Sequence, residues 1–134
     1  MNYRRFIEEN FLIDDAKSGQ LVPFVFRPVQ ARYYEELIKS YEIENKGLTS
    51  PVREIILKSR REGFSSFILG LFAADDLTNP NPTETLVISY KDDSTLTFRK
   101  RYRMFITTFA AKQLGHTIEE IRTNPGLLER VAKK

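Results

Sequence analysis

The residues best suited to chemistry lie in one window, residues 58–66, which reads Lys-Ser-Arg-Arg-Glu-Gly-Phe-Ser-Ser. This window follows an apolar stretch over 52–57 and precedes a second apolar stretch over 65–77. At a junction between a strand and a helix, backbone N–H groups and the positive helix end both face an anion. Because the window adds one lysine and two arginines, its composition favours binding of a nucleotide phosphate.

The usual phosphate-loop pattern is G-x-x-x-x-G-K-[ST]. Gly63 and Ser65 occupy the second glycine and the hydroxyl position, whereas Lys58 stands at the first glycine and Phe64 at the lysine. The strict pattern is therefore not met. The alternative is an ordinary basic loop in which Ser65 or Ser66 caps the following helix, since serine is a favoured N-cap residue.

Hydrophobic spacing and turn residues predict the elements around this loop. In the helix expected after Asp92, four aromatic residues keep a helical spacing at Phe98, Tyr102, Phe105 and Phe109. A helix–strand–loop–helix–strand–helix order predicts an α/β unit with parallel strands. The expected elements are a short helix over 3–10, an amphipathic helix over 29–45, a buried strand over 52–57, a buried helix over 65–77, a second buried strand over 85–90, a helix begun by Asp92, Asp93 and Ser94, and a short helix capped by Thr117.

Three segments resemble one protein family. ILKSRREGFSS resembles the deviant Walker A motif of large terminase subunits, the ATPases that package DNA in tailed bacteriophages, with the lysine at the start of the loop. PFVFRPVQARYYE is similar to the family's upstream adenine-side segment, with Gln30 in the place of its glutamine. NPNPTETLVISYKDDSTLTFRKRYRMF is similar to the strand and helix that follow the loop there. Together the segments cover roughly residues 22–110.

This resemblance implies the α/β class and a partial P-loop NTPase fold of the RecA-like (ASCE) type, with a short parallel sheet flanked by helices. The chain would be a single partial domain over residues 1–134, the N-terminal portion of a terminase ATPase domain. Its parts would be an N-terminal segment (1–21), a nucleotide-binding βαβ core (22–110) and a helical tail (111–134). The family's Walker B strand and nuclease domain have no counterpart in this sequence.

The resemblance also implies roles for the residues of the loop. Lys58 would contact the β- and γ-phosphates of ATP, and Arg60 would act in catalysis by sensing or stabilising the γ-phosphate. Ser65 would hold Mg²⁺ through its hydroxyl, with Ser66 beside it, and Gly63 would let the backbone approach the phosphates. The remaining loop residues counted with the nucleotide site are Ser59, Arg61, Glu62 and Phe64.

On the adenine side, Gln30 would read the base edge and Arg27 could flank the base. The alternative for Gln30 is a solvated residue in the first turn of its helix. Arg61 departs from the glutamine often found at its place in the family, and an ordinary surface charge is its alternative.

An ATPase of this class needs an acidic pair at the end of a second strand, where one carboxylate supports Mg²⁺ and the other activates water. Three pairs follow Ser65: Asp75–Asp76, Asp92–Asp93 and Glu119–Glu120. The first follows a helical pattern and the third lies within one. Asp92–Asp93 follows an expected strand, yet it stands where a helix cap is expected. We therefore expect no Walker B motif in this chain.

Composition and charge limit the other functions. The 134 residues contain no cysteine and one histidine, which excludes a disulfide scaffold, a thiolate zinc site and a cysteine nucleophile. The net charge is +3, with a basic stretch at Arg99, Lys100, Arg101 and Arg103 that is either a solvated helix face or a contact for DNA phosphates. His116 beside Gly115 is expected in a loop or helix C-cap, and no apolar run is long enough to span a membrane.

The leading hypothesis is the nucleotide-binding portion of a viral DNA-packaging motor ATPase, inactive alone, in the host bacterial cytoplasm. Its cofactors would be ATP and Mg²⁺. Its partners in the complete motor would be double-stranded DNA, a portal protein and a small terminase subunit, with oligomers formed only by the full-length motor. One alternative is a non-enzymatic accessory protein that binds DNA or a motor subunit through the basic helix. The other is a fragment of a helicase-like translocase.

Overall fold

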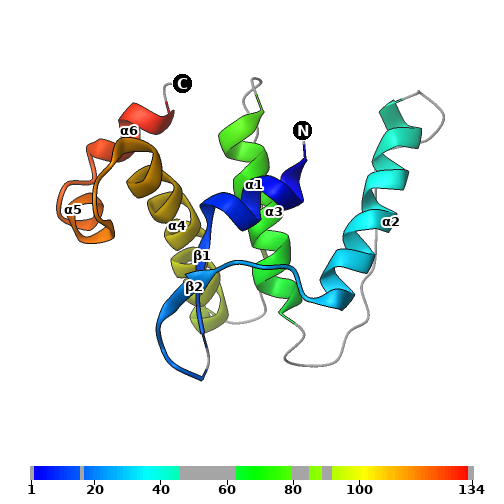
Figure 1. Cartoon of the computed structure of the whole chain (residues 1–134), viewed down its shortest axis with the longest axis horizontal. Helices are drawn as coiled ribbons and strands as arrows, with labels where there is room; N and C mark the ends of the chain where they lie inside the picture. Colours follow the sequence, from blue (N-terminus) through cyan, green and yellow to red (C-terminus); the bar gives the residue numbers. More distant parts are fainter. Residues whose placement is uncertain (1, 16, 46–62, 80–84, 89–91, 133–134) are drawn as a thin grey trace.

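Helices make up most of the described part of the chain, and a single antiparallel hairpin joins them (Figure 1). The computed structural model describes residues 2–15, 17–45, 63–79, 85–88 and 92–132. In Figure 1, α3 and α4 run side by side in the centre, and α2 stands at the right. The elements are α1 (Tyr3–Asn10), β1 (Leu12–Asp14), β2 (Leu21–Pro23), α2 (Pro28–Asn45), α3 (Phe64–Thr78), α4 (Asp92–Leu114), α5 (Ile118–Thr123) and α6 (Leu127–Ala132).

The predicted parallel α/β sheet, and with it the partial P-loop NTPase fold, is wrong for this structure. Strands β1 and β2 pair antiparallel, with Leu12 opposite Pro23 and Asp14 opposite Leu21, and no parallel pair occurs within the described ranges. Of the strand expected over 85–90, residues 85–88 are described and are not a strand. Their apolar, β-branched composition is typical of a strand, but no described segment offers them a ladder of hydrogen bonds. The strand expected over 52–57 lies outside the described residues.

The predicted helices are confirmed, and their ends have identifiable causes. Asn2 caps α1 by accepting a hydrogen bond from the backbone N–H of Arg5 at 3.0 Å. Proline suits the first position of α2, where a missing N–H costs nothing. Thr117 caps α5 as expected, because its hydroxyl accepts from the backbone N–H of Glu120 at 3.1 Å. His116 lies in the turn between α4 and α5, also as expected.

Aromatic rings from α1, the hairpin, α3 and α4 form the main core. Phe11 stacks on Phe105 with ring centroids 5.1 Å apart, and Phe26 meets Phe67 edge-on at the same distance. Such pairs stabilise a core by about 0.5–1.5 kcal/mol beyond the area they bury. A smaller cluster packs α5 and α6 against the end of α4. The main cluster contains Ile7, Phe11, Phe24, Phe26, Tyr34, Phe64, Phe67, Leu69, Ala73, Ala74 and Phe105. The smaller one contains Ala110, Ala111, Ile121 and Leu127.

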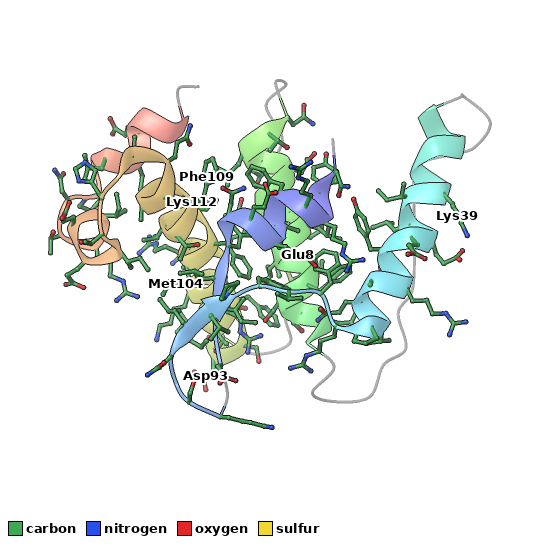
Figure 2. The ribbon with its side chains drawn as sticks, viewed as in Figure 1. Glu8, Lys39, Asp93, Met104, Phe109 and Lys112 are labelled. Atoms are coloured by element: carbon green, nitrogen blue, oxygen red, sulfur yellow. The ribbon has the colours of Figure 1, made fainter. Side chains whose placement is uncertain are left out.

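Helix α1 fixes the segment that leads from the hairpin into α2. The Glu8 carboxylate accepts the backbone N–H of Phe26 at 3.1 Å and also pairs with Arg4 at 3.1 Å (Glu8 is labelled in Figure 2). The backbone N–H of Phe24 donates to the carbonyl of Phe11 at 3.0 Å. These bonds hold residues 24–27, so the start of α2 has a defined position relative to the core.

The acidic pair near the end of α3 is bonded to tyrosine hydroxyls. Tyr3 of α1 donates to the Asp75 carboxylate at 2.8 Å, and Tyr102 of α4 donates to the Asp76 carboxylate. Asp75 and Asp76 lie inside α3 rather than after it. Burial raises the pKa of Tyr102 above its ordinary value of 10.0, and the hydrogen bond and charge of Asp76 raise it further. The pair therefore joins α3 to its neighbours.

We expect the stabilising effect of Tyr102 to be lost at alkaline pH. The raised pKa means that the folded chain keeps the phenolic proton above about pH 10, where the unfolded chain loses it. The free energy of unfolding of the wild type should exceed that of Tyr102→Phe at neutral pH, and the difference should shrink as the pH rises above about 10. Urea unfolding of both proteins from about pH 7 to about pH 11 measures it. A difference that stays constant or grows would contradict the assignment.

Candidate functional site

The N-terminal end of α3 is the point at which the phosphate-binding window enters the described structure. Gly63 is the N-cap, with φ +73° in the left-handed region, and as a glycine it has no side chain with which to cap this end; no other described side chain forms a cap here. Ser65 and Ser66 lie inside the first turn, so the alternative in which one of them caps the helix is wrong. Without a side-chain cap, the first N–H groups of α3 are suited to an anion, which the helix dipole also favours.

Gln30 connects this end of α3 to the start of α2. Its side chain is buried, with 2% of its surface exposed. The amide oxygen accepts the backbone N–H of Arg27 at 2.9 Å, and the amide nitrogen donates to the carbonyl oxygen of Gly63 at 3.1 Å. The same carbonyl accepts the N–H of Phe67 at 3.0 Å, the first hydrogen bond of the helix. Gln30 is thus not the solvated first-turn residue of the alternative interpretation.

Gly63 fits closely between its neighbours. A Cβ atom at this position would lie 2.8 Å from the Gln30 amide nitrogen, which is closer than a side chain tolerates. The same atom would lie 3.8 Å from the central guanidinium carbon of Arg27. The positive φ therefore favours glycine here, and a larger residue would also have to displace the Gln30 amide. Arg27, Gln30 and Gly63 form a junction, called the Gln30 junction below, that joins two segments 33 residues apart.

The neighbouring side chains of the first turn point in different directions. Phe64, at the position of the usual phosphate-loop lysine, is buried and meets the rings of Tyr33 and Phe67 at 5.8 Å. Ser65 borders an apolar cavity of about 330 Å³. Ser66 borders a different hollow, between α3 and α4. Successive helix residues are about 100° apart, which is why the two serines border different hollows.

Lys58, Ser59, Arg60, Arg61 and Glu62 lie outside the described residues. Of the predicted phosphate loop, the Gln30 junction therefore positions only the C-terminal end, at Gly63.

The three acidic pairs considered and set aside as a Walker B motif all lie in helices. Asp92 and Asp93 occupy the first turn of α4, and Glu119 and Glu120 the first turn of α5, where negative charge suits the helix dipole. Across the described ranges, no group of three or more histidine, aspartate or glutamate side chains could hold a metal ion. A Mg²⁺ ion takes oxygen ligands, often from phosphate, and the described chain offers it the Ser65 hydroxyl without a carboxylate cluster.

Two features of this region were not predicted from the sequence. The burial of Gln30 was not predicted, although Gln30 lies four residues before Tyr34 and so shares the buried face of α2, and this register is the signal that could have indicated it. The tyrosine hydroxyls on Asp75 and Asp76 could not be read from spacing, because the partners lie on other elements. Among the helices of the described ranges, none combines the length and the apolar composition of a membrane span.

Comparisons with protein-family models, with curated proteins and with solved structures found no match to this chain.

Proposed function

We propose that this chain is the nucleotide-binding portion of a viral DNA-packaging motor ATPase and that it binds the phosphates of ATP at the N-terminal end of α3. The observation that carries the proposal is the Gln30 junction. Two of the three segments that resemble large terminase subunits meet there, through a buried amide bonded to Arg27 and to Gly63. The proposal uses this junction and the uncapped helix end, and it involves no parallel sheet.

Each residue of the site has a separate task. The first N–H groups of α3 would face the phosphate oxygens, and Lys58 would neutralise their charge. Gln30 acts as a positioning residue, because both ends of its amide are bonded to backbone and hold Gly63 in place. Ser65 would offer its hydroxyl to the Mg²⁺ that accompanies ATP, and Arg60 would act on the γ-phosphate.

We propose that the isolated chain binds ATP with negligible turnover. Phosphoryl transfer depends on metal-supporting and water-orienting groups, and the three acidic pairs considered for that task lie in the first turn of a helix or accept tyrosine hydroxyls. Hydrolysis would require the remainder of a complete motor, in which double-stranded DNA, a portal protein and a small terminase subunit are the proposed partners. Such a motor would operate in the cytoplasm of the host bacterium.

Replacement of Lys58 tests the site. Lys58→Ala should weaken binding of a fluorescent ATP analogue about ten- to a hundredfold, because a charge-assisted contact contributes roughly 1.5–3 kcal/mol. Lys39→Ala is the matched control, since Lys39 is an exposed lysine of α2 paired only to Glu36 across one turn at 3.2 Å. It should leave the affinity unchanged. Equal losses in the two variants, or a loss of duplex DNA binding with unchanged ATP affinity in Lys58→Ala, would contradict the proposal.

A further inference from the structure

A second hollow lies on the other side of α3, where α4 passes the hairpin. It has a volume of about 720 Å³ and is bordered by β1, by the first turn of α3 at Ser66, by α4 and by α5. Figure 2 shows Met104 on the part of α4 that faces the hairpin. Thr97, Lys100, Arg101, Met104 and Thr107 reach the hollow from α4, with the spacing of one helix face. Arg103 and Phe105 flank this face and also line the hollow, so a broad face of α4 borders the space.

The rim of this hollow is strongly basic. Lys100, Arg101 and Arg103 of α4 and Arg122 of α5 line it, and all four are exposed. Within the described residues, the three α4 cations take part in no ion pair, and Arg122 pairs only loosely with Glu119, at 4.0 Å. Asp14 is the one carboxylate in the lining. Four cations facing one carboxylate create a positive field whose natural partner is anionic.

The floor of the hollow is apolar. Leu12 and Ile13 of β1 and Met104 of α4 line it, and each is half-buried. Phe105 also borders the hollow, but only 2% of its surface is exposed. A ligand that fills the hollow must therefore place carbon atoms against this floor while its charges meet the rim.

This combination fits a protein segment better than a nucleic acid. A DNA duplex presents phosphates and sugars, which gain little from contact with an apolar floor. A double helix is also too wide to enter a hollow of this volume. Single strands stack their bases on exposed aromatic rings, and the one ring here, Phe105, is covered. An acidic segment carrying an aliphatic side chain satisfies both the rim and the floor.

We propose that this hollow docks an acidic protein segment, with aspartate or glutamate carboxylates on Lys100, Arg101, Arg103 and Arg122 and an aliphatic side chain between Ile13 and Met104. This interaction goes beyond nucleotide binding and uses none of the residues of the Gln30 junction. Flexible basic side chains around an apolar depression are a common arrangement for such docking. The charges raise the association rate, and the buried aliphatic side chain of the partner slows dissociation.

The test uses two fluorescein-labelled peptides, Asp-Glu-Leu-Asp-Glu-Leu-Glu-Asp and the same peptide with both leucines replaced by serine. Fluorescence anisotropy should give tighter binding of the leucine peptide by about tenfold, since buried leucine contributes apolar area that serine lacks. Met104→Gln should remove most of this preference. Arg101→Ala combined with Arg103→Ala should weaken binding of both peptides about tenfold.

The matched control removes the same charge elsewhere. Arg32→Ala combined with Arg99→Ala replaces two exposed arginines outside the lining of the hollow, and we expect it to leave peptide affinity unchanged. Circular dichroism and thermal unfolding establish that each variant folds. Equal losses in the two double variants would show that net charge alone drives binding, and would overturn the proposal. So would equal affinity for the two peptides, or a duplex of about 20 base pairs that binds at the Arg101–Arg103 rim and displaces the leucine peptide.

Discussion

Gln30→Leu should lower the free energy of unfolding by about 1–3 kcal/mol. The substitution keeps the size of the side chain but leaves the backbone N–H of Arg27 without its acceptor and removes one donor from the Gly63 carbonyl. A buried polar group left without its partner costs about 1–3 kcal/mol. Urea unfolding measures the change.

Gln113→Leu is the control for this substitution. Gln113 is exposed on α4, so its replacement should change the stability by less than about 0.5 kcal/mol. Gln30→Leu should also weaken ATP binding, because Gly63 loses the contact that positions it. If the two variants are equally stable, the Gln30 junction does not stabilise the fold. If Gln30→Leu binds ATP as the wild type does, the junction has no role in the nucleotide site.

Among the glycines that the structure describes, Gly63→Ala should be the most disruptive single substitution. A residue other than glycine in the left-handed region costs roughly 1–2 kcal/mol, and φ at Gly63 is +73°. The added methyl group would also lie 2.8 Å from the Gln30 amide nitrogen, and crowding of this kind typically costs a further 1–3 kcal/mol, roughly. We expect a total loss of about 2–5 kcal/mol in the free energy of unfolding, with loss of ATP affinity.

Gly115→Ala separates the two causes. Gly115 has nearly the same φ, +72°, and a Cβ there would have no neighbour within 4 Å. Gly115→Ala should therefore lower the free energy of unfolding only by the cost of the left-handed backbone conformation, about 1–2 kcal/mol. Combining Gly63→Ala with Gln30→Ala should remove the crowding, so the two changes should be non-additive. Equal costs at Gly63 and Gly115 would show that Gln30 does not limit the space at the loop boundary.

The helices could be predicted from the sequence because each carries its own signal. The spacing of Phe98, Tyr102, Phe105 and Phe109 predicted α4, and all four pack in or against the main core. Thr117 and Glu120 predicted the start of α5. Capping and helical periodicity depend on residues close together in the sequence, so they predict a helix without knowledge of the rest of the fold.

The sheet could not be predicted in the same way. A short apolar run such as residues 85–88 has the composition of a buried strand. A strand forms only when a second strand pairs with it, and the sequence of the run does not show whether such a second strand exists. The hairpin of β1 and β2 was missed although a signal was present. Ser18 and Gly19 lie between the apolar pairs Leu12–Ile13 and Leu21–Val22, a pattern typical of a turn between two strands.

The candidate site was predictable in part. Residue types and family resemblance indicated the window 58–66 and Gln30, and the structure brings Gln30 to Gly63 within that window. The buried state of Gln30 and the inward position of Phe64 depend on how α2 meets α3. The basic rim likewise needed Arg122 from α5, which no local pattern connects to α4.

The most direct test of ATP binding at the N-terminal end of α3 is a titration of the ¹⁵N-labelled chain with ATP and Mg²⁺, followed through its amide resonances. The predicted result is a saturable shift of the backbone amides of Gly63, Phe64, Ser65 and Ser66 and of the Gln30 side-chain amide, because these groups form the uncapped helix end and its junction. The Lys58→Ala chain should show the same shifts only at about ten- to a hundredfold higher ATP concentration. Shifts confined to Lys100, Arg101 and Arg103, with the amides of 63–66 unmoved, would contradict the proposed nucleotide site.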